Sequence, residues 1–409
     1  MHNALFYIIL GIIIVDFVIE RWLDYLNGKK LSTELPEELK DVYDAGQYKK
    51  SQEYKRVNDR FSLITGSFSF LLILGMLIFG GFNLVDNWAR SFTGHPILIA
   101  LIFFGILAIA SDILNLPFTL YDTFVIEEKF GFNKTTARVF ILDKLKGYLL
   151  GAVIGGGILS LIIWLYQLTT TNFWLFAWIA VSLFSVFMTM FYSTLIVPIF
   201  NKQTPLEEGE LRNEIQKFSN EAGFKLDNVF VIDGSRRSTK SNAYFSGLGS
   251  RKRIVLFDTL IKDLSVNEIV GVLAHEIGHY KKKHTMTAII TSIIQTGITL
   301  YIFSLFVDNP QLSAALGSDI PSFHLGLIAF GVLYSPISMI IGLFMNHFSR
   351  KNEYTADWFA KEKYNGDALI QALKKLTSKN LSNLTPHPLY VFFHYSHPTL
   401  LQRIRALKQ

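Results

Sequence analysis

Seven long apolar segments constrain this chain more than any other feature of its sequence. A helix needs about 20 predominantly apolar residues to cross roughly 30 Å of hydrocarbon. Segments that meet this requirement, the first of them only just, lie at about 4–20, 62–85, 96–119, 147–168, 173–200, 285–307 and 322–348. The first contains Asp16 and lacks the basic start and small-residue cleavage site of a signal peptide. We therefore expect an α-helical polytopic membrane protein with seven transmembrane helices.

The composition favours the same class. Half of the residues are hydrophobic, only 18% are charged, and the mean hydropathy is +0.31, values typical of membrane proteins. The chain has no cysteine, which excludes disulfides, thiolate metal ligands and a thiol nucleophile. Its net charge of +6 does not require a nucleic-acid partner, because basic residues on one membrane face account for it.

The distribution of lysine and arginine predicts the orientation in the membrane. With the N-terminus outside, the inner segments 21–61, 120–146, 201–284 and 349–409 hold 9, 5, 14 and 10 of the 39 basic residues. Only Arg90 is left for the outer loops. Because basic residues accumulate on the cytoplasmic side, the large polar segments are predicted to be cytoplasmic.

The order of polar and apolar segments predicts a split soluble domain. We expect a membrane domain of five spans at 1–200, a first part of the catalytic domain at 201–284, two further spans at 285–348 and its second part at 349–409. Within the polar parts, an amphipathic helix is predicted at 206–223 and strands at 228–232, 241–249 and 253–257. The soluble part is thus a small α+β domain.

The segment 275–279 reads His-Glu-Ile-Gly-His and predicts a metal site. His275 and His279 are four residues apart, so on a helix both imidazoles share a face and can reach one zinc ion. Glu276 lies beside that face, where it can accept a proton from water. Ser265 and Glu268 have the spacing of a capping box, which predicts that this helix begins at about 266.

Two histidines leave a catalytic zinc site one protein ligand short. Glu353 and Asp357 are four residues apart directly after the last apolar segment, while the histidines lie directly before the preceding one. The hairpin of those two spans brings both segments to the same membrane surface. Glu353 is therefore the candidate third ligand, and Asp357 is expected to orient a ligating imidazole.

Two other segments are candidates for contact with a substrate. Asn242, Ala243, Tyr244 and Phe245 form a predicted strand that could pair with an extended peptide, although an ordinary structural strand would have the same pattern. His397 precedes Pro398, which we expect to start a terminal helix. This histidine could donate a hydrogen bond to a developing oxyanion, although a histidine in this position is more often structural.

In order along the chain, these motifs resemble the type I CAAX prenyl endopeptidases, integral-membrane zinc metalloproteases that process farnesylated proteins. The resemblance covers essentially the whole chain and rests on the seven spans, the segments 241–245, 253–260, 275–279 and 349–357, and the terminal Ser-His-Pro. It implies one Zn²⁺ per chain, a zincin-type catalytic domain, and helices arranged as a barrel around a water-filled chamber.

The resemblance also implies roles for individual residues. His275, His279 and Glu353 would be the zinc ligands, and Glu276 the general base. Asp357 would support a ligand and His397 would stabilise the transition state, with Asn242 and Arg403 near the reacting carbonyl or in the supporting network.

Substrate and compartment stay open at this point. The short loops and the terminal Leu407-Lys408-Gln409, which is no retention signal, favour a bacterial homologue in the cytoplasmic membrane, while a eukaryotic one would lie in the endoplasmic reticulum. Expected partners are a peptide or protein substrate, possibly prenylated, and membrane lipid, with the oligomeric state undetermined. One alternative is a quality-control metalloprotease for membrane proteins. Another is a transporter with a structural zinc site.

The charge distribution makes the topology testable. Reporter fusions after residues 90, 170 and 315 should report the outer side, and fusions after 45, 130, 240 and 409 the inner side, because 38 of 39 basic residues lie in the latter set of segments. An inner-side signal at 315 would contradict the hairpin that unites His279 with Glu353.

Overall fold

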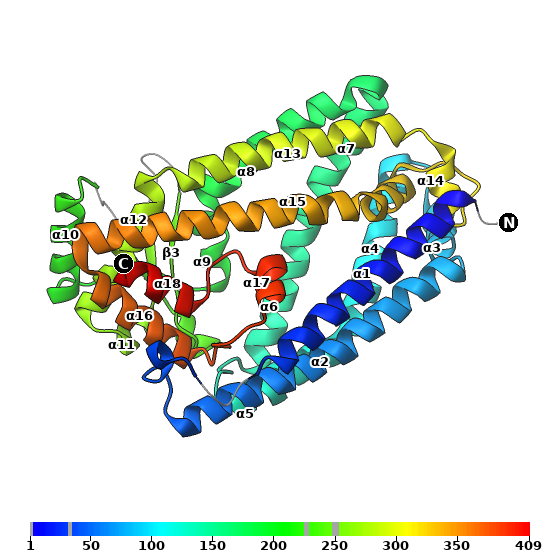
Figure 1. The fold of residues 1–409 in the computed structure, drawn as a ribbon. Helices are drawn as coiled ribbons and strands as arrows, with labels where there is room; N and C mark the ends of the chain where they lie inside the picture. The colour runs from blue at the N-terminus through cyan, green and yellow to red at the C-terminus, as the bar shows by residue number, and fades with distance from the viewer. Residues whose placement is uncertain (1–2, 32–34, 225–228, 248–252) are drawn as a thin grey trace.

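The computed structural model describes residues 3–31, 35–224, 229–247 and 253–409. Long helices make up most of the molecule, and a small α/β domain lies at one end of them (Figure 1). The long elements are α1 (Ala4–Lys29), α2 (Ala45–Ile78), α4 (Pro96–Tyr121), α6 (Ala137–Leu150), α7 (Gly156–Thr169), α8 (Phe173–Leu195), α13 (His284–Phe306) and α15 (Phe323–Ala360). The π-helical turn η3 (Gly151–Gly155) joins α6 and α7 into one continuous rod.

Six helical rods in the described part of the chain are long and apolar enough to cross a membrane, against seven predicted spans. The exception is α1, which has 26 residues but carries the charged residues Asp16, Glu20 and Arg21 from its middle onward. Ser335 on α15 donates a hydrogen bond to Asp16 at 2.9 Å, so this carboxylate takes part in a helix–helix contact. The helix α1 nevertheless packs along α2 and α15 as a seventh rod.

The seven rods form a closed ring. The order around the ring is α1, α2, α4, the α6–α7 rod, α8, α13 and α15, and α15 packs on α1 again. The contact of α2 with α4 is aromatic, since Phe61 and Phe68 both pack against Phe118. Only 6–17% of the residues in the apolar stretches are buried. A solid bundle would bury a stripe on every helix, so this arrangement corresponds to the barrel that the resemblance implies.

Short helices close the end of the ring away from the α/β domain (Figure 1). These are α3 (Gly81–Phe92) and α14 (Pro310–Ala315), which share a buried cluster with α1, α2, α4 and α15. The second span was predicted to reach residue 85, and this was wrong. The helix α2 ends at Ile78, and Gly80 adopts a left-handed conformation (φ 66°) that turns the chain into α3.

The remaining helical elements are short. They are η1 (Glu37–Leu39), η2 (Asp122–Ile126), α5 (Glu127–Phe130), η4 (Thr170–Asn172), α9 (Val197–Phe200), α10 (Glu210–Glu221), η5 (Gly234–Arg236), α11 (Asp258–Asp263), α12 (Val266–Lys281), η7 (Lys361–Asn365), α16 (Gly366–Lys379), α17 (Pro388–His394) and α18 (Leu400–Lys408). The Thr399 side chain caps α18, with Gln402 completing a capping box, so the prediction that Pro398 starts this helix was wrong.

The α/β domain is built on a mixed sheet with the order β1–β2–β4–β3. Its strands are β1 (Gln203–Pro205), β2 (Val229–Ile232), β3 (Ala243–Ser246) and β4 (Arg253–Phe257). The strands β2 and β4 are parallel, whereas β3 pairs with β4 antiparallel and forms an edge. The strands β2 and β4 confirm the predictions at 229–232 and 253–257, whereas β3 is shorter than predicted, since Ser241, Asn242 and Gly247 lie outside it. Asn228, Leu248 and Gly249 lie outside the described residues.

The helix α12 is the centre of this domain. It begins with the predicted capping box, in which Ser265 and Glu268 bond each other's backbone. A Cβ on Gly278 would meet the Ala356 backbone at 3.1 Å, and one on Gly271 would meet the Leu369 backbone at 3.1 Å. Glycine at these two positions therefore allows α12 to lie directly against α15 and α16.

Candidate metal centre

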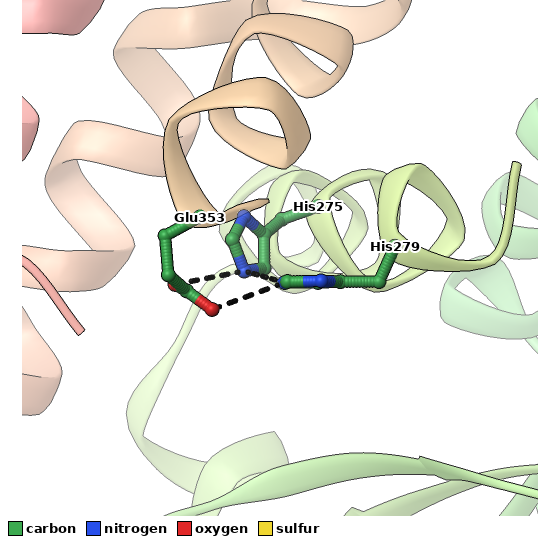
Figure 2. Close-up of side chains that lie close together, drawn as sticks. All are labelled: His275, His279 and Glu353. Atoms are coloured by element: carbon green, nitrogen blue, oxygen red, sulfur yellow. Dashed lines mark hydrogen bonds and ion pairs between the residues drawn. The ribbon is translucent and has the colours of Figure 1, made fainter. Parts of the chain in front are cut away.

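Three potential metal ligands converge where α12 meets α15 (Figure 2). The Nε2 atoms of His275 and His279 are 3.1 Å apart. Glu353 reaches them from α15, with Oε1 3.2 Å from His279 Nε2 and Oε2 3.5 Å from His275 Nε2. One ligand atom from each residue lies within 4.8 Å of the others. The trio predicted from the sequence is thus brought together from positions more than 70 residues apart.

This trio suits a cation. Glu353 Oε2 is buried and has no hydrogen-bond partner among the described residues, although Arg403 Nη1 lies 3.5 Å away, so this oxygen keeps a lone pair that a cation can use. Burial alone would lower the pKa of His279, but its hydrogen bond to Glu353 and the charges of Glu353 and Glu276 outweigh burial and raise it. The two carboxylates therefore favour positive charge at His279. Two imidazoles and a carboxylate also form a donor set that catalytic zinc sites use.

Asp357 lies directly behind His275 and fixes that imidazole. Its Oδ1 is 2.8 Å from His275 Nδ1, on the side of the ring that faces away from the trio. Arg403 holds the same carboxylate with two bonds, Nη2 to Oδ1 at 2.5 Å and Nε to Oδ2 at 2.8 Å. Both Arg403 Nη2 and the His275 Nδ1–H are donors, so Asp357 accepts from each, and the 3.3 Å between them is no bond.

His284 occupies the corresponding position behind His279, and the sequence analysis did not identify it. Its Nδ1 is 2.9 Å from His279 Nδ1, and its Nε2 is 3.1 Å from Thr355 Oγ1. Five residues separate the two histidines, which would place them on different faces of one unbroken helix. A residue type that usually ends a helix would have indicated that the two histidines can meet, and lysine at position 283 is not such a type.

A cavity of about 540 Å³ opens at the trio. Glu276 lines it, is half-buried, and has no hydrogen-bond partner among the residues that the structure describes. His397 also lines the cavity, with its side chain 63% exposed and its Nε2 3.3 Å from Glu353 Oε1. Arg403 and Asn242, two further predicted site residues, line this cavity as well.

The strand β3 forms one wall of the cavity, but not with all of the predicted residues. Ala243 and Phe245 line it, whereas Tyr244 points to the other face of the sheet and packs on Phe257. Successive side chains of a strand alternate between faces, so the Tyr244 side chain does not reach this cavity, and its part in substrate binding stays a prediction. The Phe257 N–H donates to Asn242 O at 3.1 Å. By the antiparallel alternation, the backbone groups of Ala243 and Phe245 point to the free edge.

Two families match the chain, one in each half. Residues 24–202 match the family described as CAAX prenyl protease N-terminal, five membrane helices, and residues 205–409 match peptidase family M48. The chain therefore belongs to peptidase family M48 and is a membrane metallopeptidase.

Full-length relatives narrow the class further. CAAX prenyl protease 1 of Saccharomyces cerevisiae is 36% identical over 98% of this chain and 94% of its own length. The Arabidopsis thaliana homologue is 36% identical over 98% and 96%. The crystal structure of S. mikatae Ste24p superposes with a TM-score of 0.95 at 34% identity and covers all of both chains. Within the M48 peptidases, the chain is a member of the CAAX prenyl protease 1 family, which excludes the transporter alternative.

The buried pair of Asp357 and Arg403 makes a prediction about stability. Arg403→Ala should destabilise the protein by about 3–5 kcal/mol, because it leaves the Asp357 carboxylate buried without its partner. Arg405→Ala is the matched control on the same helix, since Arg405 pairs with Glu38 at the surface and should matter little. Melting temperatures of the chelator-treated proteins in detergent would measure both. Equal shifts for the two variants would contradict a special contribution from the buried pair.

Proposed function

We propose that His275, His279 and Glu353 bind one Zn²⁺ per chain and that the protein is a zinc-dependent endopeptidase. The observation that carries this proposal is the convergence of three ligand atoms within 4.8 Å beside Glu276, a carboxylate that pairs with no other described residue. Zinc suits two imidazoles and one carboxylate, and a catalytic site keeps a position open for water. When bound, the metal would supply the positive charge that acidifies water and polarises a peptide carbonyl.

The residues around this position have separate roles in peptide hydrolysis. Glu276 accepts the proton of the attacking water and passes it to the leaving nitrogen, since it lines the cavity and bonds to no other residue in the described part of the chain. His397 donates a hydrogen bond from Nε2 to the oxygen on which negative charge develops. Ser396 Oγ lies 2.9 Å from His397 Nδ1 and orients the ring. Asp357 and Arg403 hold His275 in place.

The edge strand β3 holds the substrate in this proposal. The outward backbone groups of Ala243 and Phe245 can pair with an extended peptide, and their side chains line the cavity. Asn242 precedes the strand and also lines the cavity, and its Oδ1 accepts from Ala243 N at 2.9 Å, a bond that a pairing peptide would replace.

The substrate class that best fits is a prenylated protein cleaved near its C-terminus. The names of the relatives support it, since those proteins are CAAX prenyl proteases. The position of the site supports it as well, because α13 begins at His284 and α15 continues from its apolar stretch to Glu353. A quality-control protease for membrane proteins is the second candidate, and the position of the site near the membrane also suits it.

For the orientation, we propose that the N-terminus is outside and that the α/β domain is cytoplasmic, as the basic residues predict. In a bacterium, the membrane would be the cytoplasmic membrane. In a eukaryote, it would be the endoplasmic reticulum. Membrane lipid is then a partner of the ring of helices.

Peptide cleavage tests the proposed substrate. Purified protein should cut a farnesylated CAAX peptide at one defined bond, cut the unprenylated peptide more slowly, and lose both activities with a chelator. Mass spectrometry of the products gives the bond and the rates. Cleavage at many bonds with no preference for the prenyl group would instead favour the quality-control protease.

The assignment of Glu276 to proton transfer makes a separate prediction. Glu276→Gln keeps the size of the side chain but cannot accept a proton, so turnover should fall by roughly 10²–10⁴-fold. Zinc content, measured on the purified variant, should stay at one per chain, because the side chain lies beside the ligands. Glu362→Gln alters an exposed carboxylate in η7 and serves as the control. Loss of zinc in Glu276→Gln would make this residue a ligand, and wild-type turnover would remove it from the mechanism.

A further inference from the structure

The two histidines of the trio are held from behind in different ways. On His275, the carboxylate of Asp357 accepts from Nδ1. On His279, the group that faces Nδ1 is a third imidazole, His284, at 2.9 Å. The far nitrogen of His284 continues to Thr355, which stands two residues after Glu353 on α15.

Thr355 fixes the direction of each hydrogen bond in the series that runs from His279 through His284 to Thr355. Thr355 Oγ1 lies 2.8 Å from the carbonyl oxygen of Asn352, and a carbonyl can only accept. The single hydroxyl proton is used there, so Thr355 Oγ1 accepts from Nε2 of His284 at 3.1 Å. A neutral imidazole with its proton on Nε2 has an unprotonated Nδ1. That atom accepts, and His279 Nδ1–H donates to it.

In the neutral ring, this direction leaves the Nε2 lone pair of His279 on the side of the trio, where a metal would take the place of the proton that Nε2 otherwise donates to Glu353 Oε1 at 3.2 Å. It is the tautomer that a metal needs from an imidazole, and hydrogen bonds on the other ring nitrogen commonly select it. His284 is no ligand itself, because Nδ1 is bonded to His279 and Nε2 to Thr355. The group of ligand atoms in the described residues does not include it.

A backbone feature brings His284 into this position. Lys283 adopts a left-handed conformation with φ 60° and ends the α12 segment, so α13 starts at His284 in a new direction. Such a conformation is unfavourable for lysine, and it is found where the surrounding structure requires it. The turn directs the His284 side chain back to His279, across the five residues that separate them.

We propose that His284 and Thr355 are positioning residues that hold His279 with Nε2 toward the metal position. This inference rests on the proposed metal site. It makes Thr355 a link between the α15 backbone and the second histidine, so that one helix supplies Glu353 to the site and also orients His279.

Zinc affinity of purified variants, measured by competition with a chelator, tests the proposal. His284→Ala should weaken zinc binding by about 10–100-fold, the usual cost of losing a group that orients a ligand. His284→Asn should recover most of the affinity, because its Oδ1 takes the place of the imidazole Nδ1 as acceptor. Thr355→Val should weaken binding and Thr355→Ser should restore it. Thr291→Val is the control, since among the described residues the half-buried Thr291 bonds only its own helix, at the Thr287 carbonyl.

The absorption spectrum of the Co²⁺-substituted protein gives a second readout, since a reoriented His279 changes the ligand field. A changed band in His284→Ala and a wild-type band in His284→Asn would support the proposal. Wild-type affinity and spectrum in His284→Ala, or an affinity as low in His284→Asn as in His284→Ala, would overturn it. If His284→Ala does not fold, zinc affinities of Thr355→Val and Thr355→Ser test the proposal in its place, and equal affinities for these two variants would overturn it. His279→Ala tests the proposed metal site separately from the positioning proposal, because retention of zinc in that variant would disprove the metal site itself.

Discussion

The contact between α12 and α15 is the constraint on which the site depends. The two helices come from opposite ends of the last membrane hairpin, and no side chain separates them at Gly278, where an added Cβ would lie 3.1 Å from the Ala356 backbone. Ala356 is one turn after Glu353, and Gly278 is one residue before His279. Backbone contact therefore sets the spacing and the register of the ligands, and small side chains make this contact possible.

The charges at this contact are tied into one network. Asp357 is buried between His275 and Arg403, and Arg403 comes from the terminal helix α18. A buried carboxylate needs such partners to stay ionised. Arg403 thereby makes α18 part of the wall of the cavity. The site is complete only when the two parts of the α/β domain, before and after the last two spans, pack together.

Local rules predicted much of this arrangement from the sequence. The capping box at Ser265, the pair of histidines on one helix face, and Glu353 at the same membrane surface all follow from spacing and topology. His284 could not be found in this way. Its contact depends on a left-handed lysine, and that conformation is usually adopted by glycine or asparagine.

Other features failed or stayed open for equally physical reasons. The side to which Tyr244 points depends on the register of β3 against β4, which a short strand does not reveal. Closure of the helical ring depends on contacts such as Phe68 with Phe118, between residues 50 positions apart. Apolar periodicity shows that each helix is suited to a membrane, but it contains no information about which neighbour each helix has.

The continuity of α15 connects the membrane part with the chemistry and bears on the substrate. The helix does not end at the membrane surface: Glu353 follows Phe348 by five residues, about 7.5 Å along the axis. A peptide bond cut there must reach β3 in an extended form with unpaired backbone groups. A transmembrane helix has all of these groups paired and must unwind first. A C-terminal tail attached to a lipid is anchored at the same height and is already extended, which favours the prenylated substrate over a misfolded membrane helix.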